Sequence, residues 1–267
     1  MKNRLKIVTW NINSVRLRLP IVEKMLLDHA PDVLCLQETK CPDGSFPTAA
    51  LQRLGYDHIE FHGQKGYHGV AFISRVPLMN VERREFCGMG DTRHIAADIA
   101  FNSGHFRLHN FYVPAGGDVP DPEINEKFAH KLQFLDEMED WFGSFTDESI
   151  VVGDLNIAPY ETDVWSHKQL MRVVSHTPLE CERLEAVRTA GGYVDTMRKH
   201  IPMDQKVYTW WSYRAKDWSK ADKGRRLDHV WMTPETAAYT ESVSVLREAR
   251  GWEKPSDHAP VIAVLEA

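Results

Sequence analysis

The chain has 267 residues, which is enough for one large domain or two small ones and for a sizeable core. Its composition, 43% hydrophobic and 26% charged residues, is typical of a globular protein, and no apolar run approaches the roughly 20 residues of a membrane helix. The formal net charge of −6 gives no global sign of nucleic-acid binding, although net charge says nothing about local distribution. The amino terminus enters an alternating strand pattern without the apolar segment of a signal peptide, so we expect a cytoplasmic protein.

Short β-branched runs separated by turn signals predict strands along the whole chain. These runs cover residues 6–10, 32–37, 68–74, 94–101, 106–113, 149–154, 227–232 and 260–266. Apolar residues at helical spacing predict helices over 18–29, 125–142 and about 178–190. Because many adjacent strands lack a helix between them, we expect mixed sheets and not a purely parallel fold. Without a repeat or an obvious linker, residues 1–267 are interpreted as one domain.

The four cysteines form no C-x-x-C pair. A zinc site or a disulfide framework is therefore not expected, and buried or idle thiols in a reducing compartment fit better.

The stretch IVVGDLNIAP at 150–159 ends a predicted buried strand with Asp154 and Asn156. Both residue types are turn formers, so the stretch alone is explained by a turn. The alternative is that the strand end carries a functional site, and the rest of the chain has to decide between the two interpretations.

Polar side chains recur at the ends of the predicted strands. Besides Asp154 and Asn156, they are Asn11, Glu38, Tyr112, Asp228, Asp257 and His258. Each has a structural explanation when taken singly, as a turn former, a helix start or a surface residue. Together they form an oxygen-rich set with one histidine and no cysteine, and such a set suits Mg²⁺ or Mn²⁺. The residues alone therefore predict metal-assisted phosphoester chemistry, with the histidine contacting a phosphate or moving a proton.

Residues 206–226 combine seven Lys or Arg and only two Asp with interleaved aromatic rings. A charged stretch is most often a solvated surface. Cations mixed with tryptophans also suit nucleic acid, because Lys and Arg contact phosphates while rings stack on bases or sugars.

Six motifs give the chain a resemblance to a known family. They are TWNIN at 9–13, LQETK at 36–40, GQKGYHGVA at 63–71, GDLN at 153–156, RLDHV at 226–230 and KPSDHAP at 254–260. In order and spacing they resemble the exonuclease III family of abasic-site endonucleases, within the endonuclease/exonuclease/phosphatase superfamily. The resemblance spans essentially the whole chain. It implies an α/β fold, a four-layer αββα sandwich with two mixed sheets packed face to face and helices outside.

The resemblance also implies a metal shell. Glu38 resembles the main metal-binding carboxylate, with Asn11 and Asp257 nearby. The full set expected at the metal is Asn11, Glu38, Asp154, Asn156, Asp257 and His258. The expected cofactor is Mg²⁺, with Mn²⁺ able to substitute.

The same resemblance assigns reacting groups. Asp154 resembles the residue that activates or positions the attacking water, and Asn156 the amide that orients this nucleophile. His258 resembles the phosphate-contacting histidine and is held by Asp228. Tyr112 resembles the tyrosine whose hydroxyl reaches the phosphate.

The activity implied is cleavage of DNA 5′ to abasic sites and trimming of 3′ ends, in base excision repair. The expected partner is double-stranded DNA with abasic sites or blocked 3′ ends, acted on by a monomer that works at the nucleoid, without a membrane. The residues expected to bind DNA are Trp210, Arg214, Lys216, Arg225 and Leu227.

Two departures from the family pattern concern the substrate. Many relatives carry a large apolar residue at the place of Arg225, and Asn or Gln at the place of Ala115. Either change could shift the balance between endonuclease and 3′-exonuclease.

Rival interpretations keep the fold and change the substrate or the chemistry. They are an inositol-phosphate or sphingomyelin phosphodiesterase, a poly(A) deadenylase, and a DNA-binding repair accessory that no longer cleaves.

Overall fold

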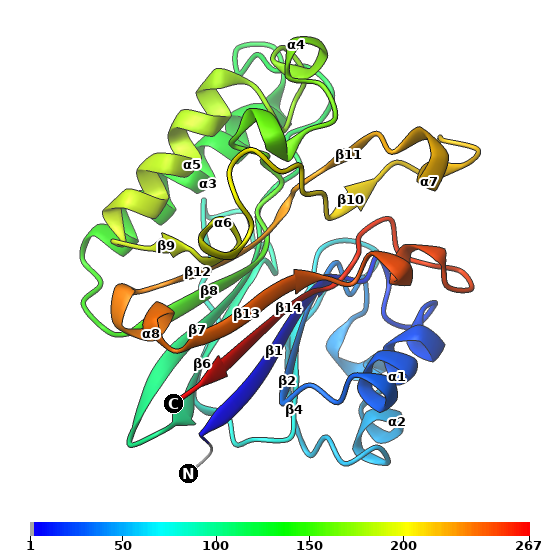
Figure 1. The fold of residues 1–267 in the computed structure, drawn as a ribbon, viewed down its shortest axis with the longest axis vertical. Helices are drawn as coiled ribbons and strands as arrows, with labels where there is room; N and C mark the ends of the chain where they lie inside the picture. Colours follow the sequence, from blue (N-terminus) through cyan, green and yellow to red (C-terminus); the bar gives the residue numbers. More distant parts are fainter. Residues whose placement is uncertain (1–2) are drawn as a thin grey trace.

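Two six-stranded mixed sheets pack face to face in the computed structural model, which describes residues 3–267 (Figure 1). The first sheet has the order β13 (Thr240–Val245), β14 (Val261–Glu266), β1 (Arg4–Asn11), β2 (Val33–Gln37), β4 (Val70–Ser74) and β3 (His58–His62). The second has the order β5 (Met79–Glu82), β6 (His94–Phe101), β7 (Gly104–Tyr112), β8 (Ser149–Asp154), β12 (Asp228–Met232) and β9 (Val194–Asp195). In each sheet one central pair is parallel, β1 with β2 and β7 with β8, and the other pairs are antiparallel.

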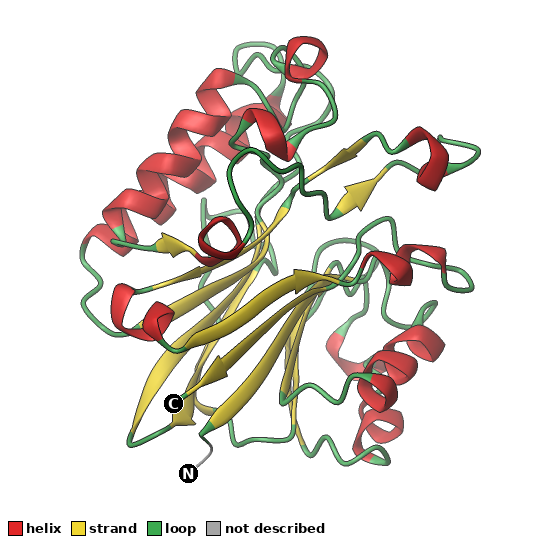
Figure 2. Ribbon diagram, viewed as in Figure 1, coloured by secondary structure: helices red, strands yellow, loops and turns green. Residues whose placement is uncertain are grey.

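Helices cover the outer face of each sheet (Figure 2). Beside the first sheet lie α1 (Leu19–Asp28) and α2 (Thr48–Gln52), and beside the second lie α3 (Glu126–Gly143) and α5 (Pro178–Ala190). Shorter elements are α4 (His167–Leu170), α6 (Thr196–His200), α7 (Trp218–Ala221), α8 (Pro234–Ala238) and a ribbon of β10 (Trp210–Trp211) with β11 (Gly224–Arg225). This arrangement confirms the predicted αββα sandwich. No helix within residues 3–267 has the length and apolar character to cross a membrane.

Strand alternation divides the core into three apolar layers. In β1, Leu5 and Ile7 face the opposite sheet, whereas Val8 and Trp10 face the helices on the other side. A third layer joins β7 and β8 to α3 and α5. Because all four of these β1 side chains are at most 1% exposed, truncating one to alanine would cost about 2–5 kcal/mol of stability.

The predicted strands and long helices are confirmed, with bounds shifted by a few residues. The sequence did not predict the short β10–β11 ribbon or the four strands that form the sheet edges, β13, β3, β5 and β9. β3 is half-buried along its whole length, and β5 is exposed at its first two residues. An edge strand pairs on one side only and buries less of each side chain, so its hydrophobic pattern is weak.

A buried ion pair joins α3 to α5. The ammonium of Lys131 on α3 lies 2.5 Å from Oε1 of Glu180 on α5, and both side chains are fully buried. Glu180 also accepts hydrogen bonds from Thr177, which caps α5 in a capping box. Lys131 in turn donates to the backbone oxygen of Asn156 at 2.9 Å. The helices on the second sheet are therefore tied directly to the loop that follows β8.

Candidate active site

The topology brings the predicted polar residues to one end of the sandwich. Asn11, Tyr112 and Asp154 end three strands that belong to the parallel pairs, and Glu38 directly follows a fourth, β2. Asp228 begins β12, which is antiparallel to β8, and it pairs in register with Asp154. Strand ends of both sheets therefore meet at one edge, where sheet scaffolds commonly hold their sites.

Asp154 and Asn156 form a turn and also face one site. Oδ1 of Asp154 accepts a hydrogen bond from the backbone N–H of Asn156 at 3.0 Å, which is the local turn that Asp favours. The Asn156 backbone has a φ of 55°, and its amide Nδ2 lies 3.2 Å from Oδ2 of Asp154. Because β8 ends at Asp154, this left-handed turn, and not the alternation of a strand, brings the Asn156 amide to Asp154.

Gly153 allows β8 to approach β7 closely just before this turn. Its φ is 140°, and a Cβ at this position would lie 2.0 Å from the backbone oxygen of Phe111. Only glycine fits here without a shift of the backbone, so the G of the GDLN motif fixes where Asp154 begins the loop.

Glu38 lies at the centre of a hydrogen-bonded cluster that joins the two sheets. Its Oε1 accepts from the Tyr112 hydroxyl at 2.6 Å and from Nδ2 of Asn11 at 3.1 Å. Its Oε2 lies 2.8 Å from the Lys40 ammonium. Burial would raise the pKa of Glu38, but Lys40, Tyr112 and Asn11 outweigh burial and lower it below its ordinary value. The same Asn11 amide donates to Oδ2 of Asp154 at 2.9 Å, so one side chain links both carboxylates.

His258 is held between two carboxylates. Its Nδ1 lies 2.8 Å from Oδ2 of Asp228, and its Nε2 lies 3.7 Å from Oδ2 of Asp154. Burial lowers the pKa of His258, but Asp228 and then Asp154 outweigh it and raise the pKa to about 10. Burial raises the pKa of Asp154 to about 7, with His258 opposing this rise and Asp228 adding to it. A charged imidazole therefore lies beside a carboxyl group that can exchange a proton near neutral pH.

Asp257 is placed by residues outside the Glu38 cluster. Its Oδ1 accepts from Nδ2 of Asn13 at 3.1 Å, and its Oδ2 accepts from Nε1 of Trp210 at 2.9 Å. Nε1 of Trp10 donates to the backbone oxygen of His258 at 2.9 Å. The Asp257–His258 pair is thus fixed by side chains from both ends of the chain.

The loops of this site contain five of the thirteen non-glycine residues with positive φ in the described part of the chain. Left-handed φ values occur at five residues of its loops, Asn13 (47°), Ser14 (87°), Glu38 (49°), Lys40 (48°) and Asn156 (55°). Such conformations cost non-glycine residues free energy and persist only where the surroundings enforce them. Together with the buried charges, this strain indicates a functional site and not an ordinary sheet edge.

A cavity of about 600 Å³ opens beside Glu38 and Tyr112. Three cationic side chains, Lys40, Arg93 and Lys127, contribute to its lining. None of the three was predicted as a site residue, although Lys40 is part of the LQETK motif. Arg93 and Lys127 gave no sequence signal, because isolated cations are common on protein surfaces. Two of these cations are already paired within the lining, Arg93 with Asp91 and Lys40 with Glu38. Lys127 makes no ion pair among the described residues, so its charge is the one left for a phosphate backbone.

The residues predicted to bind DNA divide into two groups. Trp210 contacts the site directly, through Asp257 and through a β-bridge with His258. Arg214 and Lys216 are exposed on the segment from β10 to β11, which extends away from the sheets (Figure 1). Arg225 is half-buried on β11, and Leu227 is only 5% exposed, packed against Trp210.

The donor set suits a divalent metal ion. Asp154, Asp228 and His258 offer ligand atoms within 4.8 Å of one another, and all three are buried. Among the described residues, Oδ1 of Asp228 is buried without a hydrogen-bond partner. Glu38 and Asn11 add further oxygen atoms beside Asp154. Carboxylate and amide oxygens without thiolates favour hard cations. The cysteines that the sequence predicted to be unpaired are free thiols.

The sandwich and its carboxylate–histidine site define the class of metal-assisted phosphoester hydrolases. The chain belongs to the Endonuclease/Exonuclease/phosphatase family, whose family model matches residues 8–258. It is 32% identical to exodeoxyribonuclease III of Haemophilus influenzae over 270 aligned residues, covering 97% of this chain and 99% of that one. The family is divalent-metal-dependent.

Two solved structures are similar over the whole chain. An AP endonuclease from Archaeoglobus fulgidus shares 34% identity with a TM-score of 0.90, covering 98% of this chain and 100% of that one. The 3′ phosphatase NExo from Neisseria, bound to a product DNA hairpin, shares 33% identity with a TM-score of 0.89 and the same coverage. This chain is thus about equally similar in sequence to an AP endonuclease and to a 3′ phosphatase.

Proposed function

We propose that this chain is a DNA repair nuclease that hydrolyses phosphodiesters 5′ to abasic sites and trims the 3′ ends of duplex DNA, in base excision repair. The observation that supports this most strongly is the line from Asp228 through His258 to Asp154, beside an oxygen-rich donor set and a cation-lined cavity. We further propose that residues 1–267 form one catalytic domain and that a monomer acts on double-stranded DNA.

The proposed metal is Mg²⁺, with Mn²⁺ as a substitute. Glu38 and Asn11 would hold it, with Asp154 and Asp257 nearby. Mg²⁺ supplies charge stabilisation at a phosphoryl oxygen. Both oxygens of Glu38 already have partners, the Tyr112 hydroxyl at Oε1 and the Lys40 ammonium at Oε2. A metal ion bound at Oε2 would take the place of the Lys40 ammonium.

The chain's own residues divide the reaction between them. Asp154 accepts the proton of the attacking water, and Asn156 orients that water. The water oxygen bonds to phosphorus as the P–O3′ bond breaks, and the leaving O3′ takes up the proton that Asp154 accepted from the water. His258, kept cationic by Asp228, donates to a phosphoryl oxygen from Nε2, and the Tyr112 hydroxyl donates to the same phosphate. These groups act at one phosphorus because both sheets deliver them to one edge.

The test is incubation with a duplex that carries one abasic site, with Mg²⁺ and with EDTA, read on a sequencing gel. We expect a single cut 5′ to the site with Mg²⁺ only. Equal cleavage in EDTA would contradict the metal assignment. The Glu38→Gln variant, matched in size, should lose most of the Mg²⁺-dependent cleavage while binding the duplex.

Further incubations separate the rival functions. Release of phosphate from an inositol phosphate, or shortening of poly(A) RNA, in place of DNA cleavage would favour another branch of the same family. Binding without cleavage of any of these would favour the accessory protein. Because the residues 206–226 carry exposed cations and rings, we expect DNA to be the substrate that is cleaved.

A further inference from the structure

One strand, β10, separates Arg225 from His258. Arg225 pairs with Trp210 across the β10–β11 ribbon, and Trp210 forms a β-bridge with His258. Its guanidinium lies 5.4 Å from the centre of the Trp210 ring. Two residues further on, Leu227 packs against the same ring, directly before Asp228. Trp210, Arg225 and Leu227 are called the Trp210 side of the site below.

The Arg225 side chain is fastened to the frame of the active site. Its Nη1 donates to the backbone oxygen of Val174 at 3.0 Å and to Oγ of Ser175 at 2.6 Å. The backbone N–H of Ser175 donates to Oε1 of Glu180 at 2.9 Å. Glu180 pairs with Lys131, which donates to the backbone of the catalytic-loop residue Asn156. A buried chain of contacts therefore holds the guanidinium on the Trp210 side instead of leaving it free to move into solvent.

Arg225 makes no ion pair with any carboxylate of residues 3–267, and its Nε is buried without a hydrogen-bond partner. The carboxylate that acts on it electrostatically, Glu180, is already paired with Lys131. The neighbouring Arg226 differs, since it makes charged contacts to both Asp163 and Asp195. A partly buried cation with only neutral partners is stabilised by an anion that binds beside it.

We propose that Arg225 selects the group attached to the 3′ side of the scissile phosphorus, favouring a small anionic remnant, the carboxylate of a 3′-phosphoglycolate, over the neutral sugar of an internal abasic site. This proposal rests on the proposed function, in which His258 contacts the scissile phosphate. Because Trp210 forms a β-bridge with His258, a group attached to that phosphorus reaches the Trp210 side. A neutral sugar laid on the guanidinium would remove its water without replacing the lost hydrogen bonds. A carboxylate offers charge-assisted hydrogen bonds that suit the planar guanidinium.

The reaction is the same for both substrates. Water oxygen bonds to phosphorus, the P–O3′ bond breaks, and the 3′ oxygen leaves with a proton. The phosphoglycolate, or the 5′-phosphorylated sugar, departs with the phosphorus. Only the group on the Trp210 side differs, so Arg225 acts as a specificity residue and not as a catalytic residue.

The test compares three duplexes of one sequence, with an internal tetrahydrofuran abasic analogue, a 3′-phosphoglycolate or a 3′-phosphate. The readout is kcat/KM with Mg²⁺ for each. In the wild type we expect phosphoglycolate removal to exceed tetrahydrofuran incision. Arg225→Leu should shift the ratio of these two rates toward incision by at least about tenfold, the size expected for one hydrogen bond to a charged group. An unchanged ratio would overturn the proposal.

Two further variants separate charge from packing. Arg225→Gln retains a donor for Ser175 and Val174 but no charge, so it should shift the ratio in the same direction. If the ratio of the two rates shifted in Arg225→Leu but not in Arg225→Gln, the proposal would be overturned, because altered packing and not the lost charge would explain the shift. Arg214→Leu, an exposed cation of the same segment, should lower all three rates by a common factor. Wild-type protein that cleaves none of the three duplexes with Mg²⁺ would contradict the proposed function itself, independently of any ratio.

Discussion

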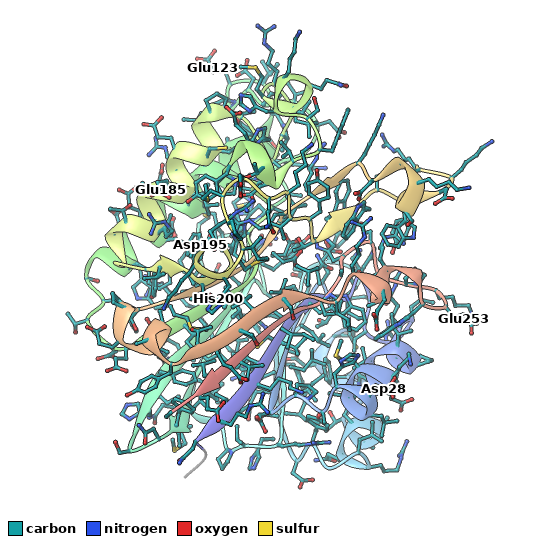
Figure 3. All side chains as sticks on the ribbon, viewed as in Figure 1. Asp28, Glu123, Glu185, Asp195, His200 and Glu253 are labelled. Carbon is teal, nitrogen blue, oxygen red and sulfur yellow. The ribbon has the colours of Figure 1, made fainter. Side chains whose placement is uncertain are left out.

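Two buried charge clusters on either side of Leu227 differ in how completely their charges are matched. On one side, Arg226 is fully buried and binds Asp163 through two hydrogen bonds of 2.8 Å and Asp195 through a third. Arg198 adds a second cation to Asp163. Asp195, labelled in Figure 3, ends β9 and caps the short helix α6. Two arginines thus face two aspartates.

On the other side, the cluster of Asp154, Asp228 and His258 contains more acidic groups than basic ones. Asp154 and Asp228 share the single imidazole of His258, and Oδ1 of Asp228 is buried without a partner among the described residues. The difference teaches that burial alone does not define function. A matched cluster stabilises the fold, whereas an unmatched cluster leaves interactions for a metal ion and a phosphate to complete.

The largest expected effect is on cleavage by Asp154→Asn. Asparagine retains the turn to Asn156 but cannot accept a proton, so single-turnover cleavage of an abasic duplex should fall by about 10²–10⁴-fold. The folded-state pKa of Asp154 is about 7, above its unfolded value, so ionised Asp154 costs stability as pH rises through 7. The variant's free energy of unfolding at pH 8, without metal, should therefore equal or exceed that of the wild type.

Urea titration and a gel assay on the same Asp154→Asn preparation provide the measurements. Near-wild-type cleavage by the folded variant would mean that Asp154 and Asn156 of the GDLN motif only form a turn and take no part in the reaction. His258→Asn should behave similarly, and the double variant should lose less than the product of the two losses, because both groups act on one transition state.

The matched cluster should show the opposite pattern. Arg226→Met leaves Asp163 and Asp195 buried with fewer partners, so the free energy of unfolding should fall by about 3–5 kcal/mol. Arg225→Leu, one residue away, should lower it by a smaller amount, about 1–2 kcal/mol, because it removes two hydrogen bonds to neutral partners but no ion pair. Urea unfolding by linear extrapolation gives both values. Equal losses in the two variants would remove the distinction between the clusters.

Two buried histidines, His229 and His258, have pKa values shifted in opposite directions. Burial, and then Arg226, lowers the pKa of His229 to about 3, whereas the pKa of His258 is raised to about 10. As pH falls below about 6.5, the unfolded chain protonates at His229 before the folded chain does, so stability is lost between about 6.5 and 3, at about 1.4 kcal/mol per pH unit. The contribution of His258 to the free energy of unfolding has the opposite pH dependence. It is fully present below about pH 6.5 and is lost as the pH rises through 10.

The measurement is the free energy of unfolding between pH 6 and 4.5 in EDTA, for the wild type and for His229→Gln. The variant's stability should decline less steeply, by about 1.4 kcal/mol per pH unit. Parallel slopes would mean that His229 is not kept neutral by the fold. An NMR titration of His258 supplies the companion value, and it should remain protonated at pH 8.

The smallest expected effects belong to the exposed cations. Arg214→Ala and Lys216→Ala should each weaken DNA binding and reduce the slope of log affinity against log salt by roughly one. Trp210→Ala should also reduce the rate of the chemical step, because Trp210 holds Asp257 and adjoins His258. Filter binding at several salt concentrations and single-turnover rates separate the two outcomes. Unchanged salt slopes in Arg214→Ala and Lys216→Ala would mean that these two side chains are solvated surface residues that do not contact DNA.

Much of this molecule could be predicted from the sequence. The central strands are apolar on both faces, so β2 and β8 were predicted within one residue at each end. The edge strands β3 and β5 were missed because their side chains are only partly buried or exposed. Asp154 and His258 were singled out because polar side chains gather at the ends of so many predicted strands, and the structure brings the two together.

By itself, the sequence determined which chemical groups are present and which strands carry them. Only the tertiary structure decided how they meet. Asn156 reaches Asp154 through a left-handed turn, and Lys40 reaches Glu38 through another. Arg225 and Arg226 are identical neighbours in sequence, yet one is matched by aspartates from distant segments and the other is not. The physical reason is that charge balance in a buried cluster depends on partners that the chain brings together only by folding.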